Sequence, residues 1–339
     1  MMFFCTVLAA CSLSACGSGA SGGVTAEAGD RMQIVTTIFP EYDWVVNVLG
    51  EERKNADVTL LMDNGVDLHS YQPTTDDILK ISSCDVFLYV GGESDGWVDD
   101  ALREAINKDM VVINLLDLLG DKAKEEEIVE GMQAEEEEEE EDPGPLAGSE
   151  QSARENDRDE VEYDEHVWLS VKNAAFYTDK IAEALSKADP VHADAYGKNA
   201  KAYIEKLTEL DNRYEKEVAA AANKTVLFGD RFPFRYLVDD YGISYYAAFV
   251  GCSAETEASF ETVTFLSGKV DELQLPAVMV IENSDQKIAK TIVDNTSSKD
   301  QQILVLDSMQ SVTSKDMAGG TTYLSVMEKN LDVLKGALR

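Results

Sequence analysis

Two short stretches of the sequence each hold a histidine in a setting that suits a metal ligand. The first surrounds His69 and the second surrounds His166. Each histidine follows acidic residues and precedes an expected helix start, so a nearby carboxylate can accept the second ring N–H while the other nitrogen binds an ion. The alternative is a pair of loop histidines that hydrogen-bond only to backbone. The chain has only three histidines, the last being His192, and two of them share this context. Both interpretations therefore stay open.

Carboxylates in the second half of the chain occupy comparable positions. Asp230 follows a predicted strand at 225–228, and Glu282 and Asp285 follow another at 277–281. In a parallel α/β sheet, functional groups gather where strands end at their carboxyl side. Two imidazoles and two carboxylates suit tetrahedral Zn²⁺ at about 2.0–2.2 Å, and they also suit Mn²⁺ with a higher coordination number. Taken singly, each of these acids can instead be a helix cap or a surface residue.

Strands alternate with helices along most of the chain, which predicts an α/β fold with mostly parallel sheets. A long amphipathic helix is expected from 191 to 223, and it separates two halves of similar architecture. Its predicted buried stripe consists of Tyr196, Ala200, Tyr203, Leu207, Leu210, Tyr214 and Val218. The predicted strands are 33–39, 58–61, 86–90 and 111–115 in the first half and 225–228, 243–249, 277–281 and 303–306 in the second.

The first residues are typical of an export signal. Residues 3–13 are mostly apolar or small, and this run is too short to span a bilayer. It ends in Leu-Ser-Ala-Cys-Gly, which resembles a bacterial lipobox with Cys16 as the lipidated residue. We therefore expect a signal peptide at 1–16, a flexible tether at 17–32, and a lipid anchor on the extracytoplasmic face of the cell membrane. No Lys or Arg precedes the apolar run, which leaves the true start codon open, and Cys11 is a weaker candidate site.

The charge of the chain is strongly negative and unevenly distributed. The 339 residues include 65 acidic and 29 basic residues, for a formal charge of −36, which disfavours nucleic acid and attracts cations. Residues 121–165 alone carry 21 acidic and 4 basic residues. Within them, a loop at 124–160 contains the run Glu135–Asp142 and is expected to be a disordered, solvated spacer. Its alternative role is a loose collector of divalent cations.

The two histidine stretches also resemble motifs of a known family. The run GVDLHSYQPT at 65–74 is similar to GVDPHxYEPT, and DEHVWL at 164–169 is similar to DPHxWL. Both motifs are typical of the zinc and manganese substrate-binding lipoproteins of ABC transporters (cluster A-I). The resemblance extends from about residue 33 to the C-terminus, apart from the acidic loop. It implies an N-terminal lobe at 33–190, a rigid backbone helix at 191–223 and a C-terminal lobe at 224–339.

By the same resemblance, His69 and His166 are the first two metal ligands. The family's third ligand is a His or Glu after the first strand of the second lobe, where this chain has Asp230. The fourth is an Asp in a segment like ESSVD, for which Asp285 is the first choice and Glu282 the substitute. Cys252 lies in a turn that resembles the family's SPEAEPS segment, and we expect it to be structural, although a thiolate there would favour zinc. Cys84 and Cys252 could form a disulfide in an oxidising compartment, but we expect two buried free thiols.

The resemblance implies a monomeric receptor, not an enzyme, that captures Zn²⁺ between two lobes and delivers it to an ABC permease for import. A manganese receptor is the alternative within the family. From other classes, a surface adhesin and a secreted zinc hydrolase remain, although the chain lacks a His-Glu-x-x-His helix. Because ligand histidines must be neutral, metal affinity is expected to fall as the pH drops through about 6.5.

Overall fold

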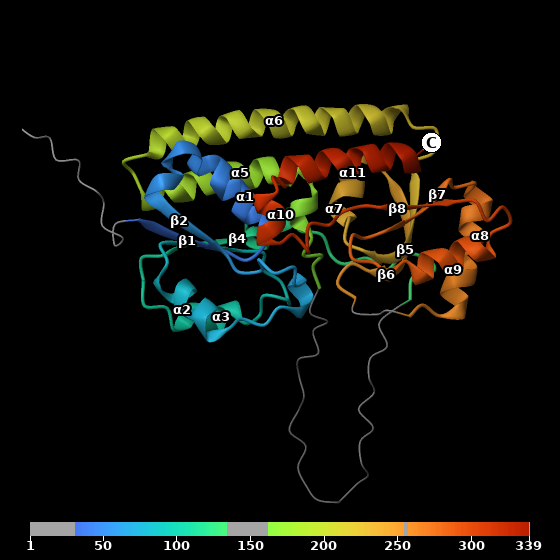
Figure 1. Cartoon of the computed structure of the whole chain (residues 1–339), viewed down its shortest axis with the longest axis horizontal. Coiled ribbons are helices and arrows are strands. Elements are labelled where there is room, and N and C mark those ends of the chain that lie inside the picture. The colour runs from blue at the N-terminus through green and yellow to red at the C-terminus, as the bar shows by residue number, and fades with distance from the viewer. Residues whose placement is uncertain (1–30, 134–161, 254–256, 339) are drawn as a thin grey trace, which may run out of the picture. The chain divides into compact units, whose positions relative to one another are not determined.

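The structure, a computed structural model, describes residues 31–133, 162–253 and 257–338 (Figure 1). The expected signal peptide, Cys16, most of the tether and the acidic run Glu135–Asp142 lie outside these residues and stay predictions. Met32–Arg339 forms one compact unit. None of the helices in the described ranges is long and apolar enough to cross a membrane.

Two four-stranded sheets confirm the predicted α/β fold. The first has the order β2-β1-β3-β4 and the second β6-β5-β7-β8, and every pairing within them is parallel. The two orders are equivalent, so the expected similarity of the two halves is confirmed. The strands are β1 Met32–Thr36, β2 Ala56–Leu60, β3 Val86–Tyr89, β4 Val111–Asn114, β5 Thr225–Phe232, β6 Ser244–Val250, β7 Ala277–Val280 and β8 Gln302–Val305.

Helices connect the strands and complete the two lobes. Thr74 caps the second helix by accepting a hydrogen bond from the Asp77 backbone N–H. The acidic residues in the first turn also stabilise this end of the helix, because they interact favourably with the helix dipole. Two helices of five residues, α4 and α10, lie where the sequence predicts no helix. The helices are α1 Phe39–Leu49, α2 Thr75–Ser83, α3 Val98–Arg103, α4 Leu115–Leu119, α5 Val171–Ala188, α6 Ala193–Ala220, α7 Arg235–Tyr241, α8 Phe260–Leu273, α9 Lys287–Asn295, α10 Ser314–Ala318 and α11 Tyr323–Ala337.

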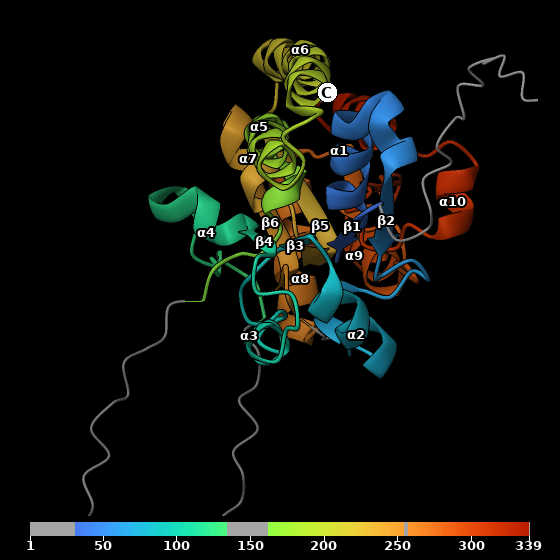
Figure 2. The same cartoon turned by 90° about the vertical axis from the view of Figure 1, so that its left-hand side faces the viewer.

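The long helix α6 packs against elements of both lobes (Figures 1 and 2). Its buried residues are the seven of the predicted stripe. Two of its tyrosine hydroxyls fix the helix to opposite parts of the fold. Tyr203 donates to the Asp43 carboxylate of α1 at 3.0 Å, and Tyr214 donates to the Met327 carbonyl of α11 at 2.6 Å. A buried hydroxyl without such a partner would be destabilising, so these bonds also fix the rotation of the helix.

The C-terminal helix α11 returns to the first lobe and holds the segment that carries His166. The Tyr323 hydroxyl donates to the Trp168 carbonyl at 2.7 Å, and the Trp168 indole donates to the Ser308 carbonyl at 2.9 Å. The Tyr323 ring also packs edge-on against Trp44 of α1, with centroids 5.3 Å apart. One large core cluster consequently includes buried residues from both lobes, and a smaller cluster lies within the second lobe.

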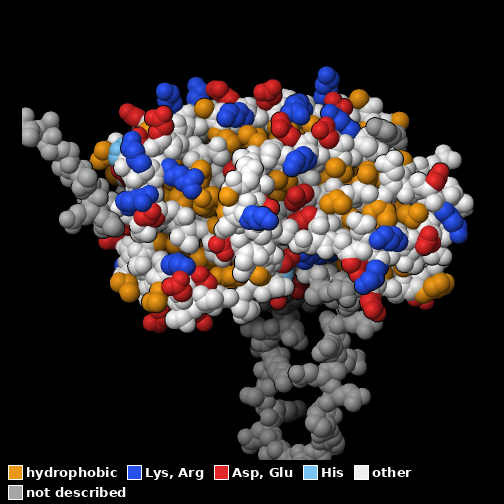
Figure 3. Space-filling model, viewed as in Figure 1, with side chains coloured by type: hydrophobic (Ala, Val, Ile, Leu, Met, Phe, Trp, Pro, Cys, Tyr) orange, Lys and Arg blue, Asp and Glu red, His pale blue; other side chains and the backbone are white. Residues whose placement is uncertain are grey.

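Charged side chains are interspersed over the face of the molecule seen in Figure 3. Lys and Arg side chains alternate with Asp and Glu there, without a large patch of either sign. The sequence places much of the acidic excess in residues 121–165, most of which lie outside the described ranges. The described residues still contain far more Asp and Glu than Lys and Arg, so the folded lobes are acidic as well.

A fully buried carboxyl, Glu41, lies in the first turn of α1. Its Oε2 accepts hydrogen bonds from the Thr37 backbone N–H at 2.9 Å, the Thr37 hydroxyl and the Ile38 backbone N–H. Burial raises the pKa of Glu41 to about 8, and the nearby Asp95 carboxyl adds to the effect. Burial likewise raises the pKa of Asp95 to about 7. The folded protein thus holds a proton on Glu41 at pH values where the unfolded chain releases it.

This buried carboxyl gives the protein a specific dependence of stability on pH. Between about pH 4.5 and pH 8 the folded state binds more protons at Glu41 than the unfolded state, so the free energy of unfolding falls as the pH rises. In Glu41→Gln, the amide oxygen accepts the same hydrogen bonds without ionising. We expect urea unfolding of this variant to lose less stability between pH 5 and pH 8 than the parent does. An equal loss in both proteins would contradict the assignment.

Candidate metal centre

His69 lies in the loop that follows β2, and a short 3₁₀ turn at Leu68–Ser70 holds it. The Asp67 carboxylate caps this turn by accepting a hydrogen bond from the His69 backbone N–H at 3.0 Å. On the ring, Nδ1 lies 2.8 Å from the Ser94 hydroxyl and 3.5 Å from a carboxylate oxygen of Glu165. These neighbours occupy Nδ1 and leave Nε2 directed away from them, as a metal-binding imidazole requires.

His166 is fully buried just before α5. One carboxylate oxygen of Asp164 accepts two hydrogen bonds from it, from the backbone N–H at 2.8 Å and from Nδ1 at 3.0 Å. Because the carboxylate accepts a hydrogen bond from Nδ1–H, the lone pair of the neutral ring lies on Nε2. The segment is held from the second lobe as well, since the Tyr236 hydroxyl donates to the Asp164 carbonyl at 3.1 Å.

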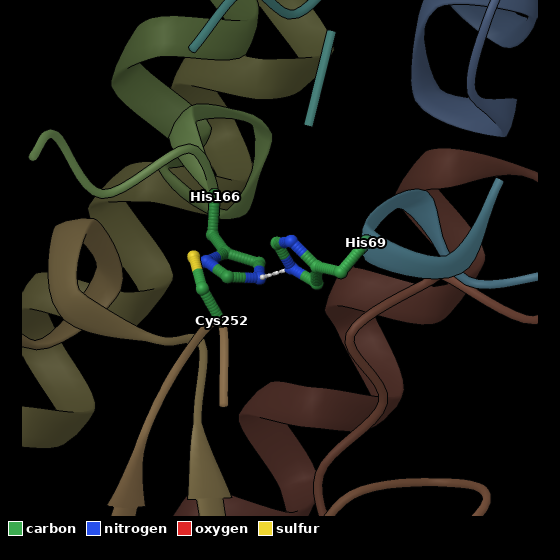
Figure 4. Close-up of side chains that lie close together, drawn as sticks. All are labelled: His69, His166 and Cys252. Atoms are coloured by element: carbon green, nitrogen blue, oxygen red, sulfur yellow. Dashed lines mark hydrogen bonds between the residues drawn. The ribbon is translucent and has the colours of Figure 1, made fainter. Parts of the chain in front are cut away.

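The two histidines meet through their Nε2 atoms, which lie 3.1 Å apart (Figure 4). Two nitrogens bound to the same tetrahedral zinc ion at about 2.0–2.1 Å lie about 3.3–3.4 Å apart. The observed separation is therefore close to that of two ligands of one ion. In the metal-free protein the same separation allows one ring to donate an Nε2–H to the other. The structure thus brings together the two residues that the sequence motifs single out.

A third side chain that could bind a metal comes from the second lobe. Cys252, two residues beyond the end of β6, has its sulfur within 4.8 Å of a ring nitrogen of each histidine. Within the described part of the chain, His69, His166 and Cys252 form the group of at least three His, Cys, Asp or Glu side chains whose ligand atoms are close enough together to hold one ion. The thiol is free, as is the buried thiol of Cys84, which confirms the expectation that the two cysteines do not pair.

Burial controls the protonation of the site. It lowers the pKa of His69, and the neighbouring His166 ring acts in the same direction. Proton competition at His69 consequently begins well below the expected pH of about 6.5, which corrects that expectation for this ligand. Burial also raises the pKa of the Cys252 thiol, and the Glu126 carboxylate adds to the effect, so the free sulfur carries its proton.

Asp230, the expected third ligand, lies at a β-bulge. The register of β5 against β6 shifts between Phe228 and Arg231, which turns Asp230 inward. Gly229 beside it packs so closely on α9 that an added Cβ would lie 2.6 Å from the Ala289 backbone. Asp230 accepts a hydrogen bond from the Arg231 backbone N–H at 2.9 Å. Its other carboxylate oxygen is buried without a hydrogen-bond partner among the described residues, and burial raises its pKa.

A cavity of about 420 Å³ adjoins these residues, and Asp230 and Asp285 both contribute to its lining. Its wall includes Asp67 and Ser253, which are close in sequence to His69 and Cys252. Arg231, which also lines the cavity, forms an ion pair with Asp67. Burial would raise the pKa of Asp67, but this guanidinium holds it below its usual range. The ion pair thus joins the loop of His69 to the first strand of the second lobe.

The structure brings none of Asp230, Asp285 and Glu282 into the cluster of His69, His166 and Cys252. Asp285 pairs with Lys287 at the surface and accepts a hydrogen bond at 2.9 Å from the backbone N–H of Lys287, the first residue of α9. Glu282 accepts hydrogen bonds from the Ser308 backbone and hydroxyl at 2.8 and 2.9 Å. Its carboxylate is therefore already used to hold the loop after β8.

Sequence reasoning did not assign roles to Ser94 and Glu165, which position the His69 ring. Glu165 was nevertheless visible inside the second motif, where the resembled family has proline. Cys252 was assigned a structural role, although its place just after a predicted strand at 243–249 matched that of the other candidate ligands. The signal was positional: an ionisable side chain at the carboxyl end of a parallel strand.

Comparisons with known proteins agree with this architecture. A sequence profile of the family described as "Zinc-uptake complex component A periplasmic" (ZnuA) matches residues 34–337. The high-affinity zinc uptake system protein ZnuA of Bacillus subtilis is 29% identical over 98% of this chain and 96% of its own length. The zinc-binding lipoprotein AdcA of Streptococcus pneumoniae is 32% identical over 91% of this chain. This chain spans only 56% of the length of that relative.

The solved structures give the same result. The Zn(II)-bound ZnuA-like domain of Streptococcus pneumoniae AdcA superposes with a TM-score of 0.67 at 29% identity, covering 91% of this chain and 99% of that domain. The metal-dependent lipoprotein YcdH of Bacillus subtilis, at 24% identity and a TM-score of 0.69, shares the fold. Since the family profile extends over nearly all of both lobes, this chain belongs to the ZnuA family of substrate-binding proteins.

Proposed function

We propose that this protein is an extracytoplasmic, lipid-anchored receptor that captures a zinc ion and delivers it to an ABC permease for import. The observation that carries the proposal is the convergence of the partly buried His69 imidazole and the fully buried His166 imidazole, whose Nε2 atoms lie 3.1 Å apart. Zinc in the names of the AdcA and ZnuA relatives supports the choice of ion. Manganese remains the alternative cargo, because carboxylate ligands suit that harder ion.

The residues around the rings prepare them to bind a cation. Asp164 holds the Nδ1 proton of His166, while Ser94 and Glu165 occupy Nδ1 of His69, so that both Nε2 atoms face one point. Burial lowers the pKa of His69 and so favours its neutral form, and the side chains of Asp164 and Glu165 lie behind the two rings. We propose His69 and His166 as ligands and Asp230 as a further one. Asp285 stays a prediction that requires Lys287 to release it.

Location and partners follow from the sequence and the family. The lipobox at Cys16 supports anchoring at the outer face of the cell membrane, and membership of a transport family supports an ABC permease as partner. The acidic chain is not suited to bind nucleic acid. We propose that the protein is a monomer and that it acts by binding and releasing the ion, not by catalysis. His69 and His166 come from two separate loops, and the sequence has no His-Glu-x-x-His motif of the kind that zinc hydrolases carry on a helix.

Competitive titration of the purified, metal-free protein tests the proposal. Zinc and manganese are titrated against chelators of known affinity. We expect tight one-to-one zinc binding that manganese does not displace. His69→Ala and His166→Ala are each expected to weaken zinc binding by about 100-fold, an equal share among four ligands of the free energy typical of a structural zinc site. His192→Ala is the matched control, because His192 pairs with Asp189 at the start of α6, away from the site.

Two outcomes would reject the zinc receptor. Unchanged zinc affinity in both ligand variants would mean that the two rings do not bind the ion. Tight manganese binding that excludes zinc would make manganese the cargo. A transport receptor is expected to show no turnover of peptides or esters. Turnover by the zinc-loaded protein would instead support the hydrolase alternative.

Asp164→Asn tests the support given to His166. The amide retains the shape of the carboxylate but not its charge, so it holds the Nδ1 proton less strongly and makes Nε2 a weaker donor. We expect zinc affinity to fall by about 10–100-fold, as for other carboxylates behind a ligand histidine. Asp189→Asn, which alters the equivalent contact to His192, is expected to leave zinc affinity unchanged. An equal affinity for parent and Asp164→Asn would show that Asp164 only holds the backbone.

A further inference from the structure

We propose that the Cys252 thiolate is the third protein ligand of the ion, so that the second lobe contributes sulfur to a His₂Cys site. This inference rests on the proposed function and specifies its coordination. The thiol lies within 4.8 Å of a ring nitrogen of both His69 and His166. Figure 4 shows Cys252 beside the His166 ring, at the end of the strands of the second lobe.

Local packing brings the cysteine to this position. Gly251, between β6 and Cys252, lies so close to His166 that an added Cβ would be 3.0 Å from the ring carbon Cε1. The strand end can therefore approach the ring only because residue 251 has no side chain. From the first lobe, Glu126 accepts a hydrogen bond from the Cys252 backbone N–H at 3.4 Å. Contacts from both lobes thus hold the backbone of Cys252 against the histidines.

Cys84 shows how an ordinary buried thiol of this protein differs. It lies in the core of the first lobe, and its sulfur donates to the Ile81 carbonyl at 3.2 Å and lies 3.7 Å from the Met110 sulfur. A buried cysteine with such neighbours behaves as a small apolar side chain. The Cys252 sulfur instead lies close to two imidazoles, which share zinc ions with cysteine in many structural sites. Its thiol also hydrogen-bonds to the Glu126 carboxylate, a bond that binding to an ion would replace.

The geometry requires a small movement of the sulfur. In a tetrahedral zinc site with Zn–N of about 2.0–2.1 Å and Zn–S of about 2.3 Å, nitrogen and sulfur lie about 3.5–3.6 Å apart. The two ring nitrogens are already near their final separation, so the thiol moves toward them by a change in the Cys252 rotamer. When the ion binds, the S–H bond breaks, the metal–sulfur bond forms and the proton passes to solvent.

A thiolate ligand also determines which ion is preferred. Sulfur favours zinc over manganese, which prefers oxygen ligands. The carboxylates assigned from the sequence are less suited to the role, because Asp285 pairs with Lys287 and Glu282 holds the loop at Ser308. Asp230, on the wall of the adjoining cavity, remains for the fourth position. The second lobe would then contribute one sulfur and one oxygen ligand.

Cobalt titration of the purified, metal-free protein tests the inference directly. Co²⁺ bound to a thiolate gives an intense near-ultraviolet charge-transfer band, which imidazole and carboxylate ligands alone do not give. We expect the band in the parent protein and in Cys84→Ala, and its loss in Cys252→Ser. Zinc affinity of Cys252→Ser is expected to fall by about 100-fold, the share of one ligand in four. Cys252→Asp, with a harder ligand, is expected to lower the ratio of zinc to manganese affinity.

Alkylation of the parent protein provides a measurement that does not depend on the folding of a variant. Saturating zinc is expected to slow the reaction of Cys252 with iodoacetamide at least tenfold, and mass spectrometry of the labelled peptide locates the change. Tight zinc binding without a charge-transfer band, or without protection of Cys252, would overturn the thiolate ligand and leave the zinc receptor intact. Absence of tight zinc binding in the parent would overturn both.

Discussion

The spacing between two sheets is the constraint on which the metal centre depends. His69 and His166 belong to the first lobe, whereas Asp230 lies within β5 of the second lobe and Cys252 follows β6. A site built from both exists only because α6 packs along both lobes and α11 returns to lock the His166 segment through Tyr323. The free energy that orders the ligands therefore comes largely from apolar burial and a few buried hydroxyl bonds far from the ion.

Much of the fold could be predicted from the sequence, because its signals are local. The period of apolar residues determined the buried stripe of α6, and the alternation of strands and helices determined two parallel sheets. The short helices α4 and α10 could not be predicted, since five residues hold too few apolar positions to show a period. Nor could the return of α11 to Trp44, which depends on which surfaces remain uncovered after both lobes form.

The candidate site was predictable only where its residues lie in motifs. His69 and His166 come from stretches whose types and spacing are specific, and the structure places them together. The carboxylate ligands were predicted only from their positions after expected strands. Such a position does not show whether another residue already binds the carboxylate. Asp285 meets Lys287 two residues later, and Glu282 meets a loop 26 residues away. Whether a carboxylate is free for an ion is decided by such tertiary contacts, which no local pattern encodes.

The continuity of α6 has a consequence for the kinetics of exchange. The helix runs for 28 residues without a proline, and buried tyrosines hold it at both lobes. Closing the sheets like hinged jaws would require this helix to bend and those hydroxyl bonds to break. For the proposed zinc cargo, we therefore expect entry and exit to depend on loop motions, which in proteins take roughly nanoseconds to microseconds, and not on hinge motions of about microseconds to milliseconds.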